Sequence, residues 1–131
     1  MKGTISSQQA ELLVSIVKKY GMIKNCTWIS FSFTSLQNIS AATTNERLGY
    51  LVSLSTGSIA TAATLKDGSN TVFIDADYGS ITQPNVELAL QSDIEVEAWT
   101  INDASITLNM ANIGVSGITT DSVNVADVLR S

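Results

Sequence analysis

The sequence predicts an α/β fold in which parallel βα repeats build a single sheet. Short runs of β-branched and aromatic residues alternate with stretches that carry apolar residues at helical spacing along the 131-residue chain. The stretches between strand candidates are long enough for right-handed helical crossovers and too long for tight hairpins. No tract rich in Gly, Pro and Ser divides the chain, so we expect one domain, 1–131.

The first half of the chain shows clear helix boundaries. Ser6 or Ser7 can cap a helix because its side-chain oxygen accepts from the free amides of the first turn, and Gly21 ends that helix. The expected elements are, in order, a helix over 8–20, a strand over 26–33, a short helix around Leu36, Ile39 and Ala42, and a strand over 47–52.

The second half repeats the pattern. The stretch 53–64, rich in Ser, Thr and Ala, is compatible with either a loop or a weak helix. Asp67-Gly68 marks a turn, and Pro84 suits the first turn of a helix. The expected elements are a strand over 71–75, a helix from 84 to 90, a strand over 94–101, a helix over 103–113, a strand over 115–119 and a last helix over 123–129.

Composition describes a packed globular protein and excludes several function classes. Hydrophobic residues make up 44% and charged residues 15% of the chain, and the net charge is −5. No cluster of Lys and Arg interleaves with aromatics, which argues against nucleic acids and anionic membranes as partners. No apolar run is long enough to span a membrane. A single cysteine, Cys26, and no histidine leave no disulfide and no zinc ligand set; we expect Cys26 to be buried beside Trp28.

The last third carries the most specific pattern. Residues 96–102 read Val-Glu-Ala-Trp-Thr-Ile-Asn, and residues 114–121 read Gly-Val-Ser-Gly-Ile-Thr-Thr-Asp. This block resembles the C-terminal end of the glycerophosphodiester phosphodiesterase family, whose signature there is Trp-Thr-Val-Asn followed by Gly-Val-Asp-Gly-Ile-x-Thr-Asp. Ile101 stands in place of the valine and Ser116 in place of the aspartate.

The resemblance extends upstream over nearly the whole chain. Ser32-Phe33, Leu36 with Ile39, and Gly49-Tyr50-Leu51 follow one another as the family's Ser-Phe pair, Leu-rich helix and Gly-Tyr-Leu strand do. It implies the C-terminal half of a TIM (β/α)8 barrel of the PLC-like phosphodiesterase type, from the end of strand 4 to the C-terminal helix. A whole barrel needs about 250 residues, so only part of one fits here.

The resemblance implies substrate-binding residues and no catalytic residue on this chain. Lys2 takes the place of the family's Glu-x-Lys lysine, which faces the substrate phosphate. Trp99 corresponds to a residue at the barrel mouth, and Ser32 and Phe33 are expected at the same rim because barrel sites form where strands end. The family's His-Arg-Gly motif, Glu-x-Asp metal pair and second histidine are absent from this sequence. A divalent cation, Mg or Ca, is therefore expected only in the complete barrel, with none bound by this chain alone.

Four acidic residues allow alternative interpretations. Asp75 and Asp77 share one side of a strand and could offer two oxygens to a cation, but a solvated turn is favoured because such cations take six or more oxygens. Glu97 shares a strand face with Trp99 and is either a buried carboxylate that needs a partner or an exposed edge residue. Asp121 is expected to cap the last helix.

Two functions are compatible with these features. The first is the C-terminal part of a glycerophosphodiester phosphodiesterase-like domain, a phosphoric diester hydrolase that acts on small-molecule phosphodiesters when complete and is inactive as this chain alone. The alternative is a non-catalytic binding or structural module of a bacterial or phage surface protein derived from the same barrel. In both cases the half-barrel has open edges, so we expect self-association or docking to a missing N-terminal half.

Overall fold

The protein contains five parallel strands that alternate with helices. The computed structural model describes residues 6–21 and 26–119. The strands β1 (Thr27–Ser30), β2 (Arg47–Leu51), β3 (Thr71–Asp77), β4 (Glu95–Trp99) and β5 (Gly117–Ile118) lie side by side in chain order. The helices are α1 (Ser7–Lys19), α2 (Phe33–Ala42), α3 (Thr56–Ala63), the short 3-10 helix η2 (Tyr78–Ser80), α4 (Gln83–Gln91) and α5 (Ala104–Asn112). The predicted parallel βα architecture is confirmed.

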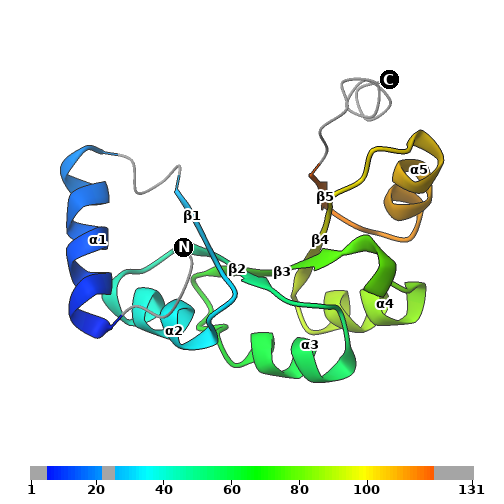
Figure 1. Cartoon of the computed structure of the whole chain (residues 1–131). Helices are drawn as coiled ribbons and strands as arrows, with labels where there is room; N and C mark the ends of the chain where they lie inside the picture. Colours follow the sequence, from blue (N-terminus) through cyan, green and yellow to red (C-terminus); the bar gives the residue numbers. More distant parts are fainter. Residues whose placement is uncertain (1–5, 22–25, 120–131) are drawn as a thin grey trace.

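The sheet is an open arc with helices along one side. Figure 1 shows α2, α3 and α4 below the curved sheet, and none of the described helices covers its opposite side. Each neighbouring strand pair is parallel, and among the described strands β1 and β5 each pair on one side only. A strand order that follows the chain without reversal is the order of a (β/α) barrel, whereas a doubly wound sheet reverses direction.

Side-chain caps set the starts of the helices. Ser6 Oγ accepts from the amide of Gln9 at 3.1 Å, and the Gln9 side chain accepts from the amide of Ser6 at 2.8 Å. Ser55 caps α3 in the same reciprocal way with Ser58. This cap, together with burial of Ile59, decides the ambiguous stretch 53–64 in favour of a helix.

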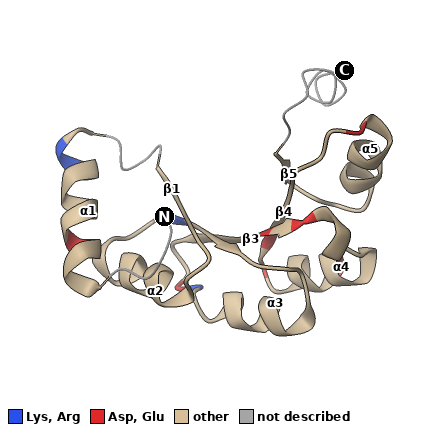
Figure 2. Cartoon of the chain, viewed as in Figure 1, with Lys and Arg blue, Asp and Glu red and all other residues tan. Residues whose placement is uncertain are grey.

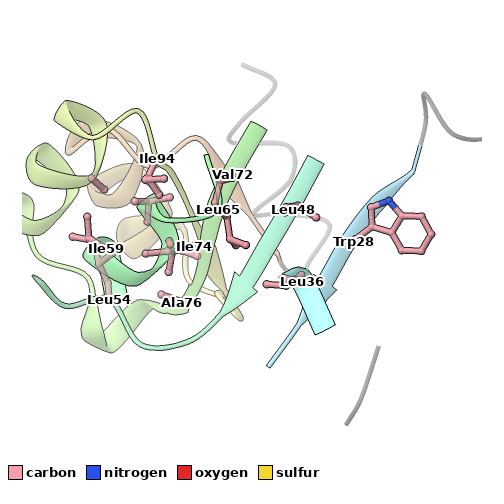
Figure 3. Packing of buried hydrophobic residues seen from close by; sticks show 14 of the residues in the cluster. Trp28, Leu36, Leu48, Leu54, Ile59, Leu65, Val72, Ile74, Ala76 and Ile94 are labelled. Carbon is pink, nitrogen blue, oxygen red and sulfur yellow. The ribbon is translucent and has the colours of Figure 1, made fainter. Parts of the chain in front are cut away.

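The hydrophobic core lies between the sheet and the helices. Side chains from both layers meet there in Figure 3, among them Leu48, Val72 and Ile74 from strands and Leu36 and Ile59 from helices. Because side chains alternate along a strand, the residues between these core positions belong to the opposite side of the sheet, which we call the inner face.

Several predicted boundaries were wrong. The strand expected over 26–33 ends at Ser30, because Ser32 accepts from the amide of Ser35 at 3.3 Å and starts α2. Phe33 is consequently the first residue of a helix. The strands expected over 94–101 and 115–119 are shorter, and β3 is longer than 71–75. Lys2, Asp121 and the helix over 123–129 lie outside the described residues. Within the described ranges, no helix has the length and apolar character needed to cross a membrane.

Candidate functional site

A pocket lies at the carboxyl ends of the strands. Its volume is about 200 Å³, and its lining is Phe31, Leu51, Val52, Ser53, Asp77 and Trp99. Each of these residues ends one of β1 to β4 or follows it within two residues. Parallel barrels place their active sites at this edge, where the loops after the strands converge.

Aromatic and aliphatic side chains make up most of the pocket wall. Trp99 is the last residue of β4 and is 38% exposed, while Phe31 directly follows β1 and is 60% exposed. Leu51 and Val52 lie at the end of β2, between these two aromatic residues in strand order. Large exposed apolar surfaces gathered in one concave place are typical of a ligand or interaction site.

Asp77 gives the pocket its negative charge. It ends β3, and one carboxylate oxygen accepts from Ser53 Oγ at 3.2 Å. Ser80 Oγ donates to the Asp77 carbonyl at 2.9 Å and accepts from the Leu54 amide at 3.0 Å, which ties the loops after β2 and β3 together. Hydroxyls, amines and cations are the groups that a carboxylate held in this way can bind.

An ion-pair cluster lies on the inner face below the rim. Arg47 Nη1 lies 3.2 Å from a carboxylate oxygen of Glu95, and Arg47 Nη2 pairs with Glu97. The Arg47 guanidinium carbon lies 4.5 Å from the ring centroid of Phe73, so the side chain crosses β3 to reach β4. The sequence allowed Glu97 to be either buried with a partner or exposed; in the structure it has a partner, Arg47. Arg47 was not anticipated, although its position next to Leu48 places it on the inner face.

Asp75 lies deeper on the same face. It is 9% exposed, and its Oδ1 has no hydrogen-bond partner among the described residues. Burial, together with the neighbouring charge of Glu97, raises the pKa of the Asp75 carboxyl to about 6. Asp75 and Asp77 share a strand face as predicted, but in the described part of the chain no three His, Cys, Asp or Glu residues gather in a group that could hold a metal ion.

The predicted substrate-binding residues are only partly brought together. Trp99 lines the pocket, whereas Ser32 and Phe33 are not part of its lining. Ser32 caps α2, and the Phe33 ring packs against Tyr50 with centroids 5.5 Å apart. Phe31 occupies the rim instead, two residues beyond Ile29 on the same face. The alternation of β1 would have identified it.

Solved structures resemble this chain, whereas sequence comparisons find no match. No protein-family model matches the sequence, and no curated protein does. A glycerophosphodiester phosphodiesterase structure from Parabacteroides distasonis is 20% identical, with 98% of this chain and 55% of that chain covered at a TM-score of 0.79. A phosphodiesterase from Oleispira antarctica, solved with the product sn-glycerol-3-phosphate, is 17% identical over 95% of this chain and 50% of its own, at a TM-score of 0.78.

A third structure agrees with these two. The glycerophosphodiester phosphodiesterase from Agrobacterium tumefaciens is 16% identical, with 95% of this chain and 52% of that chain covered at a TM-score of 0.64. The chain spans about half the length of the solved structures that it matches. Its fold is that of part of the glycerophosphodiester phosphodiesterase barrel, with a size that fits the C-terminal half.

Proposed function

We propose that this chain supplies the C-terminal half of a barrel that hydrolyses glycerophosphodiesters. The observation that carries the proposal is the pocket at the carboxyl edge of the parallel sheet, walled by Trp99 and Phe31 and holding Asp77. The pocket lies where barrel enzymes bind substrate, and the matching structures include one with bound sn-glycerol-3-phosphate.

Each pocket residue has a binding role in this proposal. Trp99 and Phe31 offer apolar surface to the carbon chain of the glycerol or of the head group. Asp77, held by Ser53, accepts hydrogen bonds from substrate hydroxyls. Ser32 and Phe33 act indirectly in this arrangement, because the cap and the packing against Tyr50 fix the start of α2 just after Phe31. Lys2 is retained as a candidate for binding the phosphate.

The groups that transfer protons and hold a cation belong to the other half of the proposed enzyme. The chain has no histidine, and its described carboxylates do not gather into a metal site. A bound Mg or Ca ion would neutralise phosphoryl oxygens in the complete protein. The residues described here bind and orient the substrate and exclude water from its apolar part.

The five described strands can be numbered within the proposed barrel. An eight-stranded barrel with five strands in the described residues needs three more. If β5 is the eighth strand, β1 is the fourth, and the other half supplies strands one to three.

An activity assay tests the proposal. The 131-residue chain and the complete protein that contains it are each incubated with glycerophosphocholine and Mg²⁺ or Ca²⁺, and released glycerol 3-phosphate is measured. We expect turnover by the complete protein and none by the chain alone. If the complete protein binds the diester without cleaving it, the chain belongs to a non-catalytic binding module, and hydrolysis as its function is rejected.

A further inference from the structure

The inner face of the sheet is strongly acidic. Among the described residues, four carboxylates point to it, those of Asp75, Asp77, Glu95 and Glu97, against the one guanidinium of Arg47. Asp77 lies at the rim pocket, and the other three lie below it. Figure 2 shows the acidic positions of β3 and β4 next to each other on the sheet. Arg47 pairs with two of the carboxylates, so negative charge remains in excess.

No described residue of this face compensates the charge of Asp75. It is nine-tenths buried even though the sheet is open, and its Oδ1 has no partner among the described residues. Its strand neighbours in the register are Leu51 on β2 and Glu97 on β4, neither of which can donate a hydrogen bond to an ionised carboxylate. A buried carboxylate without a donor is strongly destabilising unless a cation or a donor reaches it.

Closing the sheet into a barrel would make this imbalance worse. The inner face would leave water, and the carboxylates that are now part-exposed, Glu95 at 40% and Glu97 at 24%, would become interior. Desolvated like charges repel strongly in a low-dielectric interior. A second copy of this chain as the closing partner would bring four further carboxylates and one further guanidinium into the same space.

We infer that the polypeptide which closes this sheet carries lysine or arginine side chains on its own inner face, opposite Asp75 and Glu97. The inference rests on the proposed function, in which this sheet is part of a closed barrel, and it specifies the charge of the surface that closes it. The partner is a βα segment with a basic inner face, and a second copy of the chain is the wrong occupant. The raised pKa of Asp75 agrees with this shortage of positive charge, because burial and the charge of Glu97 both raise it.

A charge-reversed copy of the chain serves as the probe for this inference. The double variant Glu95→Lys with Glu97→Lys turns the inner face from acidic to basic. Sedimentation velocity is measured on the wild-type chain alone, on the reversed chain alone and on their equimolar mixture. We expect a heterodimer in the mixture with a Kd at least about ten-fold below that of either homodimer.

A control variant separates inner-face charge from net charge. Glu11→Lys with Glu87→Lys makes the same change in net charge on the exposed surfaces of α1 and α4. We expect the heterodimer of this control with the wild-type chain to have a Kd similar to those of the homodimers. Equal pairing by the two double variants, or a wild-type homodimer as tight as the heterodimer, overturns the inference.

A second variant pair decides the matter if circular dichroism shows that the reversed chain does not fold. Asp75→Asn with Glu95→Gln removes two inner-face charges and keeps the side-chain shapes. It is expected to tighten the homodimer at least about ten-fold relative to wild type. Glu11→Gln with Glu87→Gln should leave the homodimer unchanged. If the Kd of the homodimer does not fall, the inference is overturned. The proposed function is tested separately, by hydrolysis in the complete protein, and does not depend on that result.

Discussion

Arg47 on β2 reaches across the whole width of β3 to pair with Glu97 on β4. The guanidinium lies over the Phe73 ring on the way, and it also contacts Glu95. This bridge links three strands on the face that carries no helix. It joins β2 to β4 through contacts between side chains on the inner face.

Removing the guanidinium should reveal the repulsion that it offsets. Arg47→Met keeps the contact with Phe73 but leaves Glu95 and Glu97 unpaired, so we expect a loss of about 1–2 kcal/mol in the free energy of unfolding. Lys18→Met on the exposed side of α1 should change it by less than about 0.5 kcal/mol. Urea unfolding followed by circular dichroism measures both. In the Arg47→Met background, Glu97→Gln should restore part of the loss; an additive result would show that the two residues are not coupled.

Gly49 should be intolerant of any side chain. A Cβ there would lie 2.7 Å from Phe73 Cε2 and closer still to Cζ, so the ring on which the Arg47 guanidinium packs must shift. We expect Gly49→Ala to lower the free energy of unfolding by about 1–3 kcal/mol. Gly57→Ala in α3 is the matched control, because the nearest atom to its Cβ is 3.8 Å away and alanine favours the helix. Thermal unfolding with equal shifts for the two variants would contradict the packing of Phe73 over Gly49.

Stability should fall as pH rises through the titration of Asp75. Burial and the charge of Glu97 raise the pKa of the Asp75 carboxyl from its ordinary 3.8 to about 6 in the folded chain, so the folded state holds the proton more tightly. Well below pH 3.8 both states are protonated and Asp75 brings no penalty. Between these values the unfolded state ionises first, and the free energy of unfolding should drop by about 2–3 kcal/mol.

The variant Asp75→Asn tests this dependence. Urea unfolding at pH 4, 5, 6 and 7.5 should show this drop in the wild-type chain and a flatter profile in Asp75→Asn, which should be the more stable chain at pH 7.5. Glu87→Gln on α4 should keep the wild-type profile. If the free energy of unfolding instead rose between pH 4 and 7.5 in the wild-type chain but not in Asp75→Asn, the burial of this carboxyl would be refuted.

The cap of α5 should contribute measurable stability. Asp103 accepts from the Ile106 amide at 3.0 Å. Asp103→Ala should therefore lower the free energy of unfolding by about 1 kcal/mol, while Asp103→Asn, which keeps the acceptor, should lower it by much less. Equal losses for the two variants in urea unfolding would mean that the cap is not formed in solution.

Sequence alone was sufficient for the fold class and for one wall of the pocket. Alternation of strand and helix patterns gave the parallel architecture, and the residues around Trp99 placed it at the end of a strand. The predicted strand ran too far, through residues 32–33, for a local reason. The composition there favours a strand, but Ser32 caps α2 and ends the strand before these residues. Periodicity alone does not decide between these two local signals.

Tertiary contacts explain what the sequence could not show. The pairing of Arg47 with Glu97 joins residues fifty positions apart, and only the strand register brings them together. The burial of Asp75 depends in the same way on the neighbouring strands. Alternation places these residues on one face, but it does not identify their partners.

The most direct test of the account is the specificity constant of the complete protein with Trp99 removed. Trp99→Ala should lower kcat/KM for glycerophosphocholine by about ten-fold or more, because the apolar wall of the pocket is lost. Leu108→Ala, at an exposed apolar position on α5 outside the pocket, should leave kcat/KM unchanged. Wild-type kcat/KM in a folded Trp99→Ala protein would contradict the claim that this chain forms the substrate-facing rim of the barrel.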